Sequence, residues 1–270
     1  MDPLTISAVQ IESAIGDCPT NARKHGKWIE SAGKAGSSLV FFPECSLTGY
    51  DMALAANIAI GPDDPCIAAV EEEARNANIA VGYGFIERDP SGTELYATYA
   101  VTSRQGRLVY RKTHLGTRER GVLSRGDAFP VVAVKNACVG VQLCWEAHIP
   151  DITGVLRGKS AQLVLMPHAG GLGGARRLES WARYLPARAL DNGLYVAACN
   201  ALRRTADGGK RGGGIAVYSP DGVALSQYDG ADEHMLTVPI GGPLPRETPD
   251  DDMRSISYYD RRRPDLYQLD

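Results

Sequence analysis

The chain has 270 residues, of which 44% are hydrophobic and 23% charged, and its formal net charge is −3. This length suits one large α/β domain, and the near-neutral charge gives no reason to expect nucleic acid or a membrane surface as a partner. The first residues lack the basic flank and apolar core of a signal peptide, and no apolar run approaches the roughly 18 residues of a membrane span. We therefore expect a cytoplasmic protein.

Signals for strands and helices alternate along the first half of the chain. Apolar and polar residues alternate over 4–11, and residues 20–35 have helical composition. The short apolar run 39–42 ends at Pro43 and predicts a buried strand. The other predicted elements of this half are a helix over 64–78, a strand over 79–86 and a hairpin of 94–103 with 107–110.

The second half continues the alternation. Strands are predicted over 137–143, 162–166 and 194–199, one helix over 175–190, and a hairpin of 215–219 with 223–227. Helix-separated strands together with hairpins predict mixed sheets with helices outside. We expect one domain over residues 1–242. The stretch 243–270 is rich in proline and charge and predicts a tail that wraps over the surface or over a second subunit.

The six cysteines are spread widely along the chain. They form no CxxC pair and none has zinc-finger spacing with histidine, so neither a disulfide framework nor a metal site is expected. Cys18, Cys66 and Cys138 have no companion acids or bases and are interpreted as structural, and Cys199 as core filling. Cys45 is interpreted as packing, because in an extended backbone its side chain would point away from that of Glu44.

Three predicted strands end in reactive side chains, which is where α/β proteins place functional groups. Glu44 follows the run 39–42, Lys112 follows the strand that ends at Tyr110, and Cys144 follows the strand 137–143. Each alone is more often a cap, a surface charge or a core residue. Together they supply a set for acyl transfer: a nucleophilic thiol, a carboxylate that accepts its proton, and an ammonium that stabilises the intermediate. A neighbouring lysine would also lower the pKa of the thiol.

The order of these residues in their local contexts resembles the nitrilase superfamily of carbon–nitrogen hydrolases, in its amidase-like branch. The resemblance covers nearly the whole chain. Its motifs, in chain order, are Ser7-Ala8-Val9-Gln10, Phe42-Pro43-Glu44, Leu47-Thr48-Gly49-Tyr50, Arg111-Lys112-Thr113-His114-Leu115, Glu119, Leu123-Ser124-Arg125-Gly126-Asp127, Cys144-Trp145-Glu146, Pro167, Ala187-Arg188-Ala189-Leu190-Asp191-Asn192-Gly193, Ser219-Pro220-Asp221-Gly222 and Arg262-Arg263-Pro264-Asp265-Leu266-Tyr267.

The resemblance implies a four-layer αββα sandwich with mixed sheets that pairs into an αββα–αββα dimer or a higher homo-oligomer. It makes Cys144 the nucleophile and Glu44 the general base. Lys112 would stabilise charge in an oxyanion hole shared with the backbone N–H of Trp145. Glu119 matches a second active-site glutamate that supports the lysine or proton transfer. No metal or organic cofactor is implied.

Four further residues are candidates for contact with the substrate: Tyr50, Glu146, His148 and His168. His114, two residues after Lys112, invites a Cys–His mechanism, but its family counterpart does not act as the base. The glycine-rich segments 170–174 and 208–214 lack phosphate-loop patterns and are interpreted as flexible loops, the first a pocket lid.

We expect a small-molecule amide as substrate, hydrolysed to a carboxylic acid and ammonia through a thioester on Cys144. A nitrile is an alternative, because Trp145-Glu146 resembles true nitrilases, although Ala147 replaces their usual asparagine. N-carbamoyl compounds are a second alternative, although Ala147 and His148 replace their usual arginines. A catalytically silent binding subunit would have no reason to keep all four catalytic residues. A cysteine peptidase would need a Cys–His pair.

Overall fold

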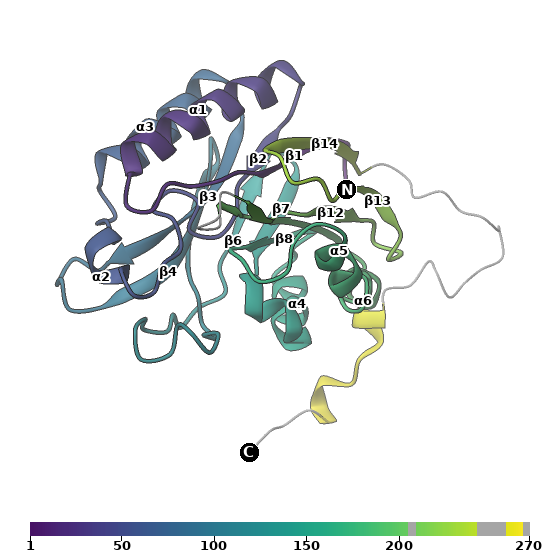
Figure 1. Ribbon diagram of the computed structural model, residues 1–270. Helices are drawn as coiled ribbons and strands as arrows, with labels where there is room; N and C mark the ends of the chain where they lie inside the picture. Colours follow the sequence, from purple (N-terminus) through teal and green to yellow (C-terminus); the bar gives the residue numbers. More distant parts are fainter. Residues whose placement is uncertain (205–208, 242–257, 267–270) are drawn as a thin grey trace.

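The computed structural model describes residues 1–204, 209–241 and 258–266. Two six-stranded sheets lie face to face, and helices cover the outer face of each sheet (Figure 1). The layers are therefore helix, sheet, sheet, helix, which confirms the αββα sandwich with mixed sheets. The pairing of two such sandwiches stays a prediction.

The first sheet consists mainly of strands from the N-terminal half. Its strands in spatial order are β14 (His234–Ile240), β1 (Leu4–Gln10), β2 (Leu39–Phe41), β3 (Ala80–Arg88), β4 (Leu95–Ser103) and β5 (Gly106–Arg111). Its helices are α1 (Cys18–Lys34), α2 (Ala55–Ile58) and α3 (Pro65–Asn76). Strands β1, β2 and β3 are parallel, and β4 is antiparallel to both β3 and β5. Strands β2 and β5 therefore end at the same edge of the sheet.

The second sheet comes from the C-terminal half. Its strands in spatial order are β13 (Ala224–Tyr228), β12 (Ile215–Tyr218), β9 (Tyr195–Asn200), β8 (Leu163–His168), β7 (Ala137–Val141) and β6 (Val131–Val134). Its helices are α4 (Pro150–Gly158), α5 (Ala175–Trp181) and α6 (Leu185–Asn192). The remaining elements are the 3-10 turns η1 (Cys144–His148), η2 (Tyr258–Arg261) and η3 (Pro264–Leu266) and the two-stranded ribbon of β10 (Leu202–Arg204) and β11 (Lys210–Gly212).

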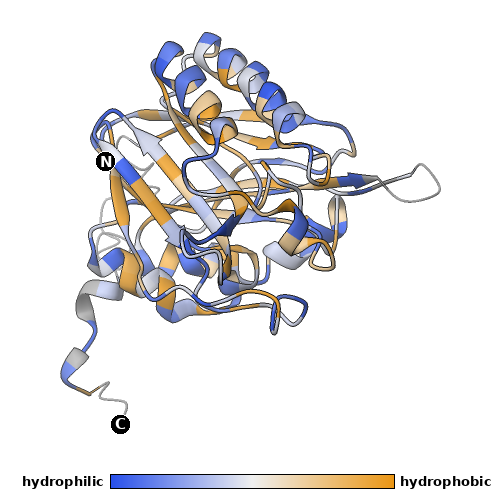
Figure 2. Ribbon diagram, turned by 90° about the vertical axis from the view of Figure 1, so that its left-hand side faces the viewer, coloured by the Kyte–Doolittle hydropathy of each residue, from blue (hydrophilic) through white to orange (hydrophobic). Residues whose placement is uncertain are grey.

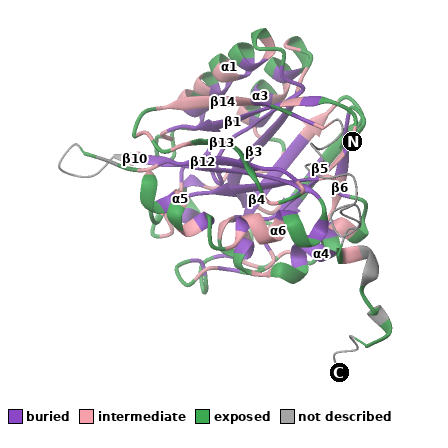
Figure 3. Cartoon of the chain, turned by 90° about the vertical axis from the view of Figure 1, so that its right-hand side faces the viewer, coloured by how far each residue is buried: buried purple, intermediate pink, exposed green. Residues whose placement is uncertain are grey.

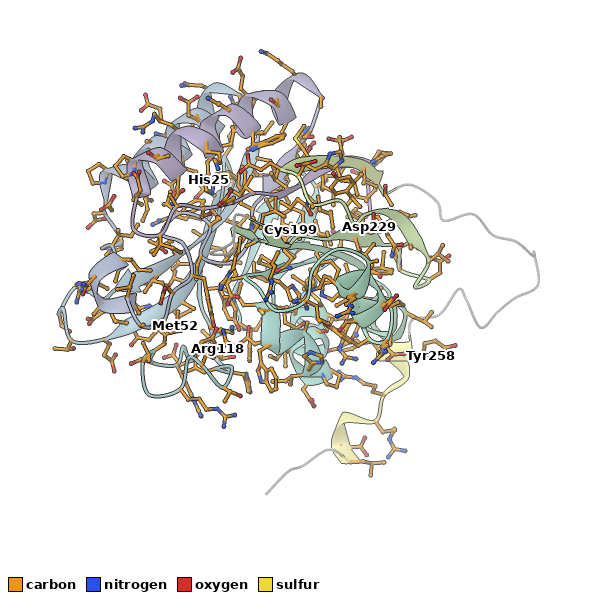
Figure 4. All side chains as sticks on the ribbon, in the orientation of Figure 1. His25, Met52, Arg118, Cys199, Asp229 and Tyr258 are labelled. Atoms are coloured by element: carbon orange, nitrogen blue, oxygen red, sulfur yellow. The ribbon has the colours of Figure 1, made fainter. Side chains whose placement is uncertain are left out.

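Three hydrophobic layers hold these elements together. The central layer lies between the two sheets and includes Ile6 and Phe41 from one sheet and Val139 and Cys199 from the other. Figure 4 labels Cys199 in the middle of the molecule, which agrees with its interpretation as core filling. The central strands of the sheets are the most buried parts of the ribbon, whereas the helices turn polar, exposed residues outward (Figures 2 and 3).

Helix α1 illustrates how local sequence determines an outer layer. The Asp17 carboxylate accepts a hydrogen bond from the Thr20 N–H at 3.1 Å, which caps the first turn. Its buried face carries His25, Ile29 and Ala32. His25 (Figure 4) lies under the helix, 4.2 Å from the Phe42 ring between centroids. Burial lowers the pKa of His25 to about 4, so this histidine is a neutral packing residue.

The helix predicted over 175–190 is two helices, α5 and α6. The chain leaves helical geometry at Tyr184, where φ is −142°. Pro186 explains the break, because proline has no N–H to donate inside a helix and disfavours helical geometry in the residue before it. It is instead accommodated in the first turn of α6. Helices α2 and α4 and strands β6, β10, β11 and β14 were not predicted, and β11 lies within the segment 208–214 that was interpreted as a flexible loop.

The predicted tail falls largely outside the described residues. Of residues 243–270, the structure describes only 258–266, where Arg262 stacks on the Tyr259 ring at 3.7 Å and Arg157 of α4 faces that ring at 5.9 Å. The division into 1–242 and a wrapping tail stays a prediction. Within the described parts of the chain, every helix is too short or too polar to cross a bilayer. The cytoplasmic location also stays a prediction.

Candidate active site

The sandwich brings the four residues predicted for catalysis together. Glu44 follows β2, Lys112 follows β5, and Cys144 follows β7 of the facing sheet. The Lys112 Nζ lies 2.8 Å from Glu44 Oε1 and 2.8 Å from Glu119 Oε1. The charges of Glu44 and Lys112 both act on the Cys144 thiol. One cluster therefore contains a thiol, an ammonium and two carboxylates.

The backbone at Cys144 has an unusual conformation. Leu143 is extended, and Cys144 then adopts φ of +46° at the start of turn η1. A non-glycine residue with positive φ is uncommon, and such strain is concentrated at functional sites. The thiol is half-buried at this sharp change from strand to turn.

The loop that carries Glu44 packs tightly on β3. A side chain at Gly84 would place its Cβ 2.5 Å from the Cys45 backbone nitrogen, so only glycine permits this approach. The Leu47 N–H donates to Gly84 O at 2.9 Å, and the Ile86 N–H donates to the Thr48 hydroxyl at 3.0 Å. The loop is therefore fixed to the sheet, which holds the Glu44 carboxylate in place.

Cys45 is a packing residue, but not for the reason derived from the sequence. Its backbone is not extended: φ is +54°, in the left-handed region. The side chain is 1% exposed and lies in an apolar cluster with Ala55 and Ile86. A thiol buried in this cluster is not accessible to a substrate.

Lys112 is a completely buried cation. Burial alone would lower its pKa, but the carboxylates of Glu44 and Glu119 and the Cys144 group outweigh burial and raise the pKa well above its usual value. The amine therefore stays protonated. A fixed, water-excluded positive charge is suited to stabilising an oxyanion.

Glu44 has the properties of a general base. Burial, together with the charge of Glu119, raises the pKa of Glu44 to about 7 against the opposing effect of Lys112. Among the residues that the structure describes, its second oxygen, Oε2, has no hydrogen-bond partner although it is buried. An unpaired carboxylate oxygen with a pKa near neutrality can both accept and return a proton at physiological pH.

The Cys144 thiol departs from the expectation that its lysine neighbour lowers its pKa. Burial and then the charge of Glu44 raise the pKa to about 12, and the opposing charge of Lys112 is too weak to reverse this. The resting thiol is therefore protonated. Among the charged groups that act on the thiol, the Glu44 carboxylate has the strongest effect.

Glu119 orients Lys112. Its Oε1 accepts hydrogen bonds from Lys112 and from the Tyr50 hydroxyl at 3.1 Å, and its Oε2 accepts one from the Gly116 N–H at 2.6 Å. The side chain is thus anchored at both oxygens. Tyr50, a candidate for substrate contact, lies beside this cluster, and Arg203 faces its ring at 5.0 Å.

Glu146, by contrast, is not free to contact a substrate. Its Oε1 accepts hydrogen bonds from the Tyr110 hydroxyl, from the N–H and hydroxyl of Thr113 and from the His114 N–H. Its Oε2 accepts from the Leu143 N–H. We correct its role to positioning: this fully buried carboxylate links the segment after Lys112 to the turn at the thiol.

His168 is likewise committed to protein partners. Its Nδ1 lies 2.9 Å from Met166 O, and its Nε2 lies 3.2 Å from the Trp181 indole nitrogen, which donates to it. Burial lowers its pKa well below the usual value, so the ring is neutral. Both ring nitrogens are occupied, and the predicted substrate contact is corrected to core packing.

His148 remains a candidate for contact with a substrate, and its ring lies near that of Trp145. The rings of Trp145, His148 and Tyr184 follow one another, with centroid distances of 5.7 Å and 4.3 Å. Trp145 is 45% exposed although it follows the half-buried Cys144. These rings form a partly exposed aromatic wall next to the thiol. The oxyanion role of the Trp145 N–H stays a prediction.

Two groups near the thiol were not predicted. The Ala169 backbone N–H hydrogen bonds with the Cys144 sulfur, and the charge of Arg177 also acts on this sulfur. Both lower the pKa of Cys144, but burial raises it by more. Arg177 donates to Leu172 O at 3.1 Å, and Asn200 donates to the same carbonyl at 3.0 Å. The segment 170–174 is therefore held by hydrogen bonds. No sequence signal marked these contacts.

An αββα sandwich that gathers a thiol, an ammonium and two carboxylates in one cluster is suited to acyl transfer. Residues 5–246 match the family model for carbon–nitrogen hydrolases, and the chain belongs to this family. It is a hydrolase that acts on non-peptide carbon–nitrogen bonds.

Relatives and solved structures agree with this assignment. Nitrilase homolog 2 from Dictyostelium discoideum is 27% identical over 93% of this chain and 77% of its own length. An omega-amidase from Xenopus tropicalis is 26% identical over 93% of this chain and 92% of its own. The structure of an amidase from Nesterenkonia sp. AN1 superimposes with a TM-score of 0.81 at 25% identity, over 97% of this chain and 98% of its own.

Proposed function

We propose that this protein hydrolyses small-molecule amides to a carboxylic acid and ammonia through a thioester on Cys144. The main support for this proposal is that the buried Lys112 lies between the carboxylates of Glu44 and Glu119. Glu44 has an unpaired oxygen, and its charge acts on the Cys144 thiol. The names of the relatives also support an amide, since they include an omega-amidase and an amidase.

In the first half-reaction, the Cys144 sulfur attacks the amide carbonyl carbon while its proton passes to Glu44 Oε2. Lys112 and the Trp145 backbone N–H stabilise the negative oxygen of the tetrahedral intermediate. The intermediate collapses when Glu44 returns the proton to the nitrogen. The carbon–nitrogen bond breaks, ammonia leaves, and the acyl group remains on sulfur as a thioester.

In the second half-reaction, water attacks the thioester carbonyl and gives a proton to Glu44. Collapse of the second intermediate breaks the carbon–sulfur bond, the acid leaves, and Glu44 returns the proton to the thiolate. The sum is one amide and one water converted to one acid and one ammonia. A pKa near 7 lets Glu44 act as base and acid in turn.

A screen for ammonia release tests this proposal. The purified protein is incubated with small aliphatic and aromatic amides, nitriles and N-carbamoyl compounds. We expect turnover of amides, and formation of a hydroxamate when hydroxylamine is added, because hydroxylamine traps a thioester. Cys144→Ala should lose both signals while its circular dichroism spectrum is unchanged. Substantial hydrolysis by that variant would refute the assignment of the nucleophile.

The alternatives give different outcomes in the same screen. Turnover of nitriles without amides would identify a nitrilase, and turnover of N-carbamoyl compounds alone would identify a carbamoyl hydrolase. No ammonia from any class, with intact folding, would favour a silent binding subunit.

A further inference from the structure

Three side chains of metal-binding type lie together in the outer helical layer. They are Cys18, in the first turn of α1, and Asp64 and Cys66, at the start of α3. One sulfur or oxygen atom from each lies within 4.8 Å of the corresponding atoms of the other two. Helices α1 and α3 run side by side over the first sheet (Figure 1), so this cluster links the two helices.

The two thiols are directed at each other and at the carboxylate. The Cys18 thiol hydrogen bonds with the Cys66 thiol, which in turn hydrogen bonds with Asp64. Both cysteines are free thiols. Asp64 Oδ1 also accepts a hydrogen bond from the Cys66 backbone N–H at 2.8 Å, which fixes the carboxylate beside the sulfur atoms. Cys18 is only 6% exposed, but Cys66 and Asp64 are half-buried, so solvent reaches one side of the cluster.

The charges around the thiols are negative. Burial raises the pKa of Cys18, and Cys66, Asp64 and Asp17 raise it further. Burial also raises the pKa of Cys66, with Asp64 and Asp17 again acting in the same direction. A bound cation would place a positive charge among these negative groups.

We propose that Cys18, Cys66 and Asp64 bind one thiophilic divalent cation such as Zn²⁺ or Cd²⁺. Each thiol releases its proton and donates a sulfur electron pair, the carboxylate supplies an oxygen, and water completes a tetrahedron. Two protons are released for each cation bound. Zinc–sulfur bonds of about 2.3 Å in a tetrahedron place the sulfur atoms roughly 3.8 Å apart, so a shift of about 1 Å closes the site.

Such a cation would stabilise the region behind the general base. The chain just before α1 contacts the loop that follows Glu44: the Gly16 N–H donates to Thr48 O at 2.9 Å. Asn21 of α1 donates to Leu47 O, also at 2.9 Å. Linking the starts of α1 and α3 restrains the helices against which this loop lies. Because only the folded state holds the three ligands together, the cation raises the stability of the fold.

The test uses full-length Cys144→Ala protein, so that the nucleophilic thiol cannot contribute. Reduced protein is titrated with Cd²⁺. Binding is followed by the ultraviolet charge-transfer absorption of cadmium–thiolate bonds and by calorimetry. We expect one equivalent to bind with two sulfur ligands, to release two protons and to raise Tm. Cys18→Ser and Cys66→Ser should each weaken binding by at least about a hundredfold, and Asp64→Asn by about tenfold. Cys138→Ser and Asp63→Asn are the matched controls and should bind as before.

A second readout needs no substitution in the site. In the same protein, Cd²⁺ should slow alkylation of Cys66 at least tenfold and leave the partly exposed Cys138 unaffected. Binding that persists in the Cys18→Ser/Cys66→Ser double variant would overturn the proposal. So would a reduced protein that takes up no cation, including one that instead forms a Cys18–Cys66 disulfide on exposure to oxygen.

Discussion

At the active-site thiol, burial and the charge of Glu44 together exceed the effect of Lys112, so the resting pair is a thiol and a carboxylate. Catalysis then depends on the fraction of Glu44 that is ionised. This differs from thiol enzymes in which a positive neighbour creates a standing thiolate. In the proposed mechanism the proton leaves sulfur only as the carbon–sulfur bond forms.

The rate should therefore follow the ionisation of Glu44. Because its pKa is raised to about 7, kcat/KM for an amide should fall about tenfold per pH unit below that value and level off above it. Glu44→Gln cannot accept a proton and should lose at least about a thousandfold in kcat/KM. Initial rates measured from pH 5 to 9 check both. A profile that is flat through pH 6 would contradict the role of Glu44.

At the scale of elements, Glu146 connects three segments: the end of β5, the residues after Lys112 and the start of η1. Glu146→Gln replaces an acceptor oxygen by an N–H group that faces other donors. We expect a loss of about 1–3 kcal/mol in the free energy of unfolding, because buried donors become unpaired. Since Lys112 and Cys144 also lose their common support, kcat should fall more than KM changes.

Urea denaturation and steady-state kinetics with a good amide substrate measure both effects. Glu72→Gln, at an exposed position of α3, serves as the control and should behave like the parent protein. If Glu146→Gln raised KM alone, Glu146 would be a substrate contact after all.

Most elements of the sandwich were predictable because their patterns are local. Alternation over 4–11 and the run 39–42 correspond to β1 and β2. The break between α5 and α6 was missed because amphipathicity continues across it and only Pro186 marks it. Strand β14 was missed because it is half-buried and is stabilised by pairing with β1 from the opposite end of the chain.

Glu44, Lys112 and Cys144 could be singled out as candidates because each follows a strand, whereas Glu119 was indicated only by the family resemblance. The roles of Glu146 and His168 were not predictable, because whether a polar side chain faces a substrate or a protein partner depends on distant residues such as Tyr110 and Trp181. The cluster of Cys18 and Cys66 was missed for the same reason: its ligands come from two different helices, and no spacing rule covers them.

For the whole molecule, we propose a homodimer formed around α6 and β13. Leu190, Val223 and Leu225 are 42%, 57% and 43% exposed. The turn at Gly222 packs on α6, since a Cβ there would lie 3.4 Å from the Leu190 Cβ. Exposed apolar side chains grouped in this way favour association with a second copy.

Sedimentation velocity should give the mass of a dimer for the parent protein. Val223→Glu should shift it toward the monomer, because a charge would be buried without a partner. Val109→Glu on β5, at a similarly exposed position of the other sheet, should not. A monomeric parent protein would contradict this arrangement.

Removal of metal ions tests whether catalysis is independent of them. The proposed mechanism uses Cys144, Glu44, Lys112 and the Trp145 backbone N–H, and no step needs a metal ion, so kcat should be unchanged in excess EDTA. Tm could be lowered by loss of a cation from Cys18 and Cys66 without any change in mechanism. An ammonia assay in EDTA at a temperature well below Tm separates the two effects, and a loss of turnover there would point to a metal-dependent reaction.

The complete burial of Lys112 has a consequence for the ionic strength that the site tolerates. Dissolved ions weaken attraction between charges that water surrounds, such as Lys34 and Glu30, whose side chains are 74% and 64% exposed. They cannot enter between Lys112 and its carboxylates, which are 0–3% exposed. The attraction between Lys112 and its carboxylates should therefore change far less with salt than the attraction between Lys34 and Glu30.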